Sequence, residues 1–254
     1  MSLITIENLN FSYVSDNIIR DLSFCLEGGH IYGFVGKNAI GKTTVLKLIS
    51  GLITFKNKNQ IKFNGKDIFT LDQSEISREV TYCTDDINTE FSLSLYDFVS
   101  FGLYSRPRLK NQDQLINDVL NKLGLSSLVN KNVSDLSGGQ KQLAILAKAL
   151  VQDSNCIIFD ETFSKLDLNH QTIVYDILLH LKSKNKIIVI VMHDLNLLLE
   201  WIDILFVLID SKKIVSGNVN EILTESLIKE MFGDSRLGLS ENPFTKKKKI
   251  FFKK

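Results

Sequence analysis

The fold of this chain is decided by one stretch, Gly36-Lys37-Asn38-Ala39-Ile40-Gly41-Lys42-Thr43, which has the G-x-x-x-x-G-K-[ST] spacing of a phosphate-binding loop. Residues 31–35 before it are an apolar run and predict a buried strand, and residues 44–50 after it predict a helix. Such a turn directs several backbone N–H groups toward one point, where the helix dipole adds partial positive charge. The stretch therefore predicts a polyphosphate site, in which Lys42 neutralises phosphate oxygens and the Thr43 hydroxyl is a ligand of Mg²⁺. An ordinary strand–turn–helix corner is the alternative.

Further polar side chains follow two other apolar runs. Residues 155–159 predict a buried strand that ends in Asp160-Glu161, and residues 187–192 predict another that ends at His193. Strands alternate with helices in this part of the chain, which indicates a parallel sheet with helices on its faces. Because ligands of open α/β sheets bind at the carboxyl ends of the strands, we expect these side chains to lie beside the phosphate-binding loop.

Composition limits the class of protein. The 254 residues are enough for one large domain or two modest ones, and 30 Lys+Arg balance 29 Asp+Glu, which gives no sign of nucleic-acid binding. Three widely spaced cysteines, Cys25, Cys83 and Cys156, predict small buried side chains in a reducing compartment. No signal peptide is recognised, and the apolar runs are shorter than the ~20 residues that span a bilayer. We therefore expect a cytoplasmic protein that reaches a membrane only by docking to another protein.

The regions around the predicted core differ in character. Residues 3–11 and 17–26 predict two strands with Tyr13 in the loop between them, and residues 60–68 predict a hairpin with an Asn-Gly turn. After a short strand at residues 80–83, the stretch from 86 to 135 has only helical spacing, at residues 95–104 and 114–123. This stretch predicts a helical subdomain inserted into an α/β core.

A second motif, Leu136-Ser137-Gly138-Gly139-Gln140, begins a predicted helix that runs to about residue 151. With this motif about twenty residues before the strand that ends in Asp-Glu, the chain resembles the ATP-binding subunits of ABC transporters over essentially its whole length. The resemblance implies an α/β fold, a P-loop NTPase core with a mixed sheet, an antiparallel β subdomain and an inserted helical subdomain. It implies a single ABC ATPase domain over residues 1–254, with core and β subdomain at about 1–85 and 155–254 and the helical subdomain with the signature helix at about 86–154.

The resemblance also implies an ATP hydrolase with ATP and Mg²⁺ as cofactors. The catalytic residues would be Lys42, Glu161 as the general base that polarises the attacking water, and His193 as the switch histidine that contacts the γ-phosphate. Thr43 and Asp160 would hold Mg²⁺. The alternative for Glu161 is a carboxylate that only tunes the metal site.

A second ATP would be held by the signature motif, since two such subunits bind two ATPs in a head-to-tail dimer. Asp167 matches the D-loop that crosses this interface, and Tyr13 matches the aromatic residue that stacks on adenine, with a surface tyrosine as its alternative. The full predicted nucleotide-binding set is Tyr13, Gly36, Lys37, Asn38, Ala39, Ile40, Gly41, Lys42, Thr43, Thr44, Ser137, Gly138, Gly139, Gln140 and Asp167.

The chain departs from the family pattern at four positions. Asp85 stands where the family usually has Gln; a carboxylate can still ligate Mg²⁺, so Asp85 joins the predicted metal ligands, but it adds negative charge near the γ-phosphate. Leu143 replaces a common Arg, Lys165 replaces a small residue of the D-loop, and Ala39 replaces a P-loop Gly. Since the phosphate, metal and base positions are intact, an active ATPase is expected.

Residues 192–233 resemble the ATPase subunits of iron-siderophore, haem and vitamin B12 importers. In those systems two copies, most often a homodimer, dock beneath two transmembrane permease subunits at the cytoplasmic face of the membrane. The candidate groove for the permease is residues 85–105, from Asp85 to Ser105; no contact with nucleic acid or with the transported substrate is expected. The alternatives are an ABC exporter ATPase and a weakly active regulatory ATP-binding module.

The end of the chain is rich in lysine. Residues 246–254 hold six lysines around Ile250-Phe251-Phe252. We expect a solvated terminus or a charged edge strand here. Contact with anionic lipid is the alternative.

Overall fold

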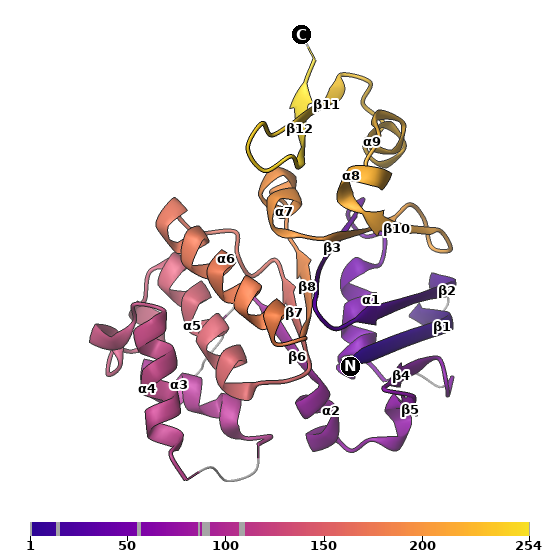
Figure 1. Ribbon diagram of the computed structural model, residues 1–254. Coiled ribbons are helices and arrows are strands. Elements are labelled where there is room, and N and C mark those ends of the chain that lie inside the picture. Colours follow the sequence, from indigo (N-terminus) through magenta and orange to yellow (C-terminus); the bar gives the residue numbers. More distant parts are fainter. Residues whose placement is uncertain are drawn as a thin grey trace.

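A six-stranded sheet forms the centre of the protein (Figure 1). The computed structural model describes residues 2–13, 16–54, 57–85, 87, 92–106 and 110–253. Neighbouring strands of the sheet are, in order, β10 (Ile214–Asn218), β9 (Ile204–Leu208), β3 (His30–Gly36), β8 (Ile187–Val191), β7 (Cys156–Asp160) and β6 (Val80–Thr84). All neighbours are parallel except β9 and β10, which are antiparallel, so the predicted mixed sheet is confirmed.

The middle strands are apolar because both of their faces are covered. Every residue of β7 and of β8 is buried, as expected for parallel strands between two layers. The register pairs Asp160 with Val191 of β8 on one side and with Thr84 of β6 on the other. The carboxyl ends of these three strands therefore meet at one edge of the sheet.

A smaller antiparallel sheet of four strands lies beside the central sheet, in the order β2 (Asp16–Glu27), β1 (Leu3–Tyr13), β4 (Ile61–Phe63) and β5 (Lys66–Asp67). The predicted hairpin is confirmed, because Asn64 and Gly65, between β4 and β5, have the positive φ values that its turn requires. The placement of Tyr13 in a loop was wrong: β1 and β2 stay paired as far as Tyr13 and Asp16.

Helices complete the fold. They are α1 (Lys42–Ile49), α2 (Gln73–Glu79), α3 (Leu95–Ser100), α4 (Gln112–Lys122), α5 (Gly138–Gln152), α6 (Leu168–Ser183), α7 (Leu195–Trp201), α8 (Val219–Ile222) and α9 (Glu225–Phe232), with 3-10 turns at Ile68–Thr70, Phe101–Leu103, Ser126–Leu128 and Val133–Asp135. The sequence analysis missed α2, although Asp72 and Glu75 form a capping box at its start. Among the described residues, no helix is both long and apolar enough to span a bilayer.

Two hydrophobic clusters lie on the two faces of the central sheet. One joins the sheet to α1 and to the antiparallel sheet, and in it the rings of Phe34 and Phe206 stack at 4.9 Å. The other joins the sheet to α3, α4, α5 and α6. Residues of β7 alternate between the clusters, with Ile158 in the first and Ile157 and Phe159 in the second. Leu143, the replacement for a common Arg, is a fully buried member of the second cluster.

The end of the chain forms a hairpin of β11 (Leu237–Glu241) and β12 (Lys248–Phe252), at the top of Figure 1. The described lysines of residues 246–253 all contact the protein itself. Their ammonium groups reach the Ile202 carbonyl (Lys247, 2.6 Å), the Leu223 carbonyl (Lys248, 2.7 Å), and the carboxylates of Glu225 (Lys253, 2.7 Å), Glu200 (Lys249, 3.6 Å) and Glu241 (Lys246, 3.8 Å). Of the two expectations, the charged edge strand is the one that the structure shows.

The Phe34–Phe206 stack predicts how the core responds to truncation. Phe34 is fully buried, so Phe34→Ala should lower the free energy of unfolding by about 3–5 kcal/mol. Urea denaturation followed by circular dichroism measures the loss. Phe252→Ala is the matched control: its ring is 73% exposed, and the change should stay within about 0.5 kcal/mol. Equal losses in the two variants would contradict this account of the core.

Candidate functional site

The loop between β3 and α1 has a backbone shape that depends on glycine. Gly36 has a φ of +153°, and a Cβ atom there would lie 2.6 Å from the Leu208 carbonyl oxygen. Gly41 is the N-cap of α1 and gives no side-chain hydrogen bond to the first turn. The first N–H groups of the helix are consequently open to an anion. Ala39, which replaces a usual Gly, has a left-handed φ of +60°.

The Lys42 side chain folds back across this loop. Its ammonium donates to the carbonyl oxygens of Gly36 at 2.8 Å and of Lys37 at 3.0 Å. Burial lowers the pKa of Lys42, while Glu161 and Asp160 act in the opposite direction and raise it. An ammonium group partly removed from water makes strong, charge-assisted hydrogen bonds, so Lys42 is suited to bind the oxygens of a polyphosphate.

A cavity of about 530 Å³ brings most of the predicted phosphate-site residues together. It is lined by Ile18, Asn38, Ala39, Gly41, Lys42, Thr43, Thr44, Glu161 and His193. Glu161 and His193, which follow the ends of two strands, lie beside the phosphate-binding loop in this cavity, in agreement with the expectation from the sequence. Ile18 of β2 was not singled out by the sequence, because its place depends on how the antiparallel sheet packs against the loop.

Glu161 and His193 face each other at this cavity. His193 Nε2 lies 3.0 Å from Glu161 Oε1, and the two side chains are 67% and 46% exposed. The Glu161 backbone has a left-handed φ of +57°, and its N–H donates to the Val191 carbonyl at 2.8 Å. Left-handed backbone is costly for a residue with a side chain, so the contact with β8 holds Glu161 in a conformation that it would otherwise leave.

Asp160 lies deeper, at the end of β7, and is 6% exposed. Its Oδ2 accepts a hydrogen bond from the Tyr82 hydroxyl at 2.6 Å. Its Oδ1 is buried and has no hydrogen-bond partner among the residues that the structure describes. Burial, and then the hydrogen bond to Asp160, raise the pKa of Tyr82 well above its ordinary value, so the hydroxyl keeps its proton. A buried, unsatisfied carboxylate oxygen beside a phosphate cavity fits a hard cation such as Mg²⁺.

The other predicted nucleotide residues lie outside this cavity. Ser137 and Gln140 form a capping box at the start of α5, and Asp167 caps α6 through the N–H of His170 at 2.9 Å. Gly138 lies against the side chain of Lys165, and a Cβ atom there would be 3.1 Å from the Lys165 Cδ. The Tyr13 side chain is 47% exposed and packs edge-to-face on Phe11 at 4.8 Å.

Asp85 pairs with a residue far along the chain. Its Oδ2 lies 3.4 Å from the Lys165 ammonium, and both side chains are about half exposed. The Lys165 N–H also donates to Gln142 Oε1 at 3.0 Å. Two of the four departures from the family pattern are thus partners of each other.

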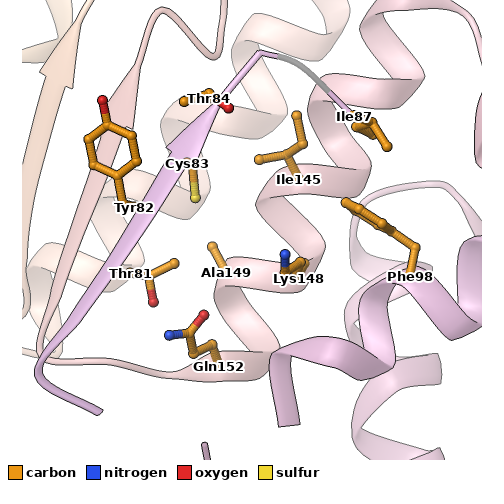
Figure 2. A pocket seen from close by; sticks show the side chains of 10 residues that line it. All are labelled: Thr81, Tyr82, Cys83, Thr84, Ile87, Phe98, Ile145, Lys148, Ala149 and Gln152. Carbon is orange, nitrogen blue, oxygen red and sulfur yellow. The ribbon is translucent and has the colours of Figure 1, made fainter. Parts of the chain in front are cut away.

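A second cavity, of about 220 Å³, lies between β6, α3 and α5 (Figure 2). Phe98, Ile145 and Ile87 supply apolar surface, and the Lys148 ammonium lies 5.3 Å from the centre of the Phe98 ring. In the described parts of the chain Lys148 has no ion pair. Burial raises the pKa of the Cys83 thiol, another lining group, to about 12, so it stays protonated. Of the candidate groove at residues 85–105, Ile87 and Phe98 line this cavity, and residues 86 and 88–91 are outside the described ones.

Comparisons of the sequence and of the fold with known proteins point to the same family. The family described as ABC transporter matches residues 19–164. The petrobactin import ATP-binding protein YclP of Bacillus subtilis is 30% identical over 91% of this chain and 92% of its own length. The achromobactin transport ATP-binding protein CbrD of Dickeya dadantii is 31% identical over 91% and 88%. A solved structure titled as an inward-facing conformation of a metal-chelate type ABC transporter is 26% identical, with a TM-score of 0.77 over 99% of this chain and 97% of that one.

The loop geometry predicts the effect of a single methyl group at Gly36. Gly36→Ala would force a φ that costs a non-glycine residue about 1–3 kcal/mol and would press Cβ against the Leu208 carbonyl. We therefore expect ATP affinity to fall by at least about tenfold, measured by isothermal titration calorimetry. Gly65→Ala is the control, since Gly65 also has a positive φ but has open space around it; it should bind ATP like the wild type. Normal affinity in Gly36→Ala would contradict the assignment of this loop.

Proposed function

The chain belongs to the ABC transporter family, whose ATP-binding subunits are ATPases, and we propose that it is the ATP-hydrolysing subunit of a membrane importer for an iron chelate. The observation that carries the ATPase part is the Glu161–His193 contact at the cavity that Lys42 and Thr43 also line. The iron-chelate part is supported by relatives named for petrobactin and achromobactin transport.

In the proposed hydrolysis of ATP, each residue at the cavity has a separate role. The open N–H groups of the loop and the Lys42 ammonium bind the β- and γ-phosphates of ATP. Glu161 accepts the proton of the attacking water, and His193, 3.0 Å away, holds the Glu161 carboxylate and contacts the γ-phosphate. Thr43 and Asp160 would hold Mg²⁺, which when bound neutralises charge on the phosphates. Asp85 would join them only if its carboxylate left Lys165.

Two copies would complete the site. Ser137, Gly138, Gly139 and Gln140 begin α5, and Asp167 begins α6, away from the cavity of their own subunit. In a head-to-tail homodimer these segments face the ATP of the partner subunit, and the helix N-terminus supplies N–H groups to its phosphates. ATP binding closes the dimer and hydrolysis resets it. Tyr13, half exposed at the end of β1, is the proposed contact for adenine.

The cavity between β6, α3 and α5 is the proposed docking site for the transmembrane permease. Its lining mixes apolar side chains such as Phe98 and Ile145 with polar ones such as Gln152 and the Lys148 ammonium, and this mixture suits a short amphipathic segment of a membrane protein. Docking there would hold the subunit at the cytoplasmic face of the membrane as a peripheral protein. The transported chelate would have no contact with this chain.

Replacement of the base tests the catalytic assignment. Glu161→Gln keeps the shape and hydrogen-bonding reach of the side chain but cannot accept a proton from water. We expect ATP hydrolysis to fall by about 10²–10⁴-fold while ATP binding persists, with the ATP-bound protein eluting as a dimer in size-exclusion chromatography. Phosphate release measured over a range of protein concentrations should rise more than linearly for the wild type.

The control for this experiment is Glu230→Gln, which removes a surface carboxylate paired with Lys213 and should leave the rate unchanged. Full turnover by Glu161→Gln would remove Glu161 as the base. ATP binding without hydrolysis in the wild type would favour a regulatory ATP-binding module over a transport ATPase.

A charge reversal tests the docking site. Lys148→Glu would place an unpaired carboxylate among Phe98 and Ile145, at a cost on docking of about 2–5 kcal/mol. After co-expression with the permease encoded nearest to this chain, the variant should be lost from the detergent-purified complex. Lys131→Glu, an exposed change outside the cavity, should co-purify normally, and thermal unfolding checks that both variants fold. Normal co-purification of Lys148→Glu would place the permease elsewhere.

A further inference from the structure

Tyr82 lies on β6 and is among the residues that border the docking cavity, but its side chain leaves the strand on the face away from α5. Figure 2 shows the Tyr82 ring directed away from the residues of α5, whereas Cys83, the next residue, faces them. This follows from the two-residue period of a strand. The register pairs Thr84 with Asp160, so Tyr82 is the next residue along β6 on the same face as that pair. A long aromatic side chain at this diagonal position can reach the end of β7.

The Tyr82 hydroxyl uses this position to bind one oxygen of the Asp160 carboxylate. The distance of 2.6 Å to Oδ2 is that of a strong, charge-assisted hydrogen bond between a hydroxyl and a carboxylate, and the contact is partly buried. The other oxygen, Oδ1, is buried and has no hydrogen-bond partner among the described residues. The two oxygens of one carboxylate therefore have different surroundings: one is bound to the protein and the other is left for a ligand.

We infer that Tyr82 is a positioning residue, whose hydroxyl fixes the rotation of the Asp160 carboxylate so that Oδ1 is held ready for the metal ion of the nucleotide. The inference rests on the proposed function, because it takes Asp160 as a metal-binding residue. A free carboxylate can rotate and exchange its two oxygens, and a bound one cannot. Removing a hydrogen-bond partner of a metal-binding carboxylate typically costs 10–100-fold in metal affinity.

The test is Tyr82→Phe, which removes only the hydroxyl and keeps the ring. The dissociation constant of a non-hydrolysable ATP analogue is measured by calorimetry with excess EDTA, and then the Mg²⁺ affinity of the protein–analogue complex is measured by titration. We expect Mg²⁺ affinity to fall by about tenfold and the affinity in EDTA to stay unchanged. A general loss of packing would instead weaken binding equally under both conditions.

The chain contains a matched control. The Tyr96 hydroxyl donates to Asp113 Oδ1 at 2.5 Å, so it is also a Tyr–Asp pair, but it joins α3 to α4 away from the phosphate cavity. Tyr96→Phe should change neither dissociation constant. Thermal unfolding of both variants confirms that each is folded. In an Asp160→Asn background, where the carboxylate is absent, Tyr82→Phe should cause no further loss of Mg²⁺ affinity.

The outcomes separate this inference from the proposed function. Unchanged Mg²⁺ affinity in Tyr82→Phe, or an equal loss with and without Mg²⁺, would overturn the role of Tyr82 and leave the ATPase assignment intact. A further loss in the Asp160→Asn background would show that Tyr82 acts through another group and would also overturn it. Wild-type binding that does not respond to Mg²⁺ at all would overturn both the metal site and this inference.

Discussion

The structure depends on one constraint, the parallel pairing of β3, β8, β7 and β6, which brings the carboxyl ends of four strands to a single edge. Parallel strands of this kind must be covered on both faces, and two hydrophobic clusters supply that cover. Polar side chains of these strands are then favoured at the edge where the strands end. Gly36, Asp160 and the residues after Val191 are there because each closes a strand in this register. The site is therefore a consequence of the sheet, and the loops only complete it.

The sequence could predict those site residues that directly follow a recognisable strand along the chain. The phosphate-binding loop, Asp160-Glu161 and His193 each follow an apolar strand directly, so a strand-end rule finds them without a structure. Tyr82 could not be found in this way, because its partner is 78 residues away and the contact depends on the register between β6 and β7. The helix α2 was also missed, although its capping box is a local signal that the sequence alone contains.

The lysine-rich end of the chain shows why a charge count does not locate a charged surface. Each described lysine of residues 246–253 reaches a carbonyl or a carboxylate of the same molecule. The Asn196 side chain also joins this hairpin to α7, through hydrogen bonds in both directions with the backbone of Ile250 at 2.8 and 3.1 Å. Positive charge that is used to attach a hairpin is less available to attract a distant anionic surface. The sequence gives the number of lysines, but the fold determines which groups their ammonium ions contact.

The pair of Asp85 and Lys165 bears on the negative charge that Asp85 was expected to add near the γ-phosphate. An ion pair this exposed contributes at most about 1 kcal/mol to stability, so stability is a weak explanation for it. The ion pair has a clearer effect on the electrostatic potential that Asp85 produces at a distance. A carboxylate 3.4 Å from an ammonium acts at longer range as a dipole, and the potential of a dipole falls off faster with distance than that of a single charge. Two departures from the family pattern are thus the partners of one ion pair, in which the Lys165 ammonium offsets the charge of the Asp85 carboxylate.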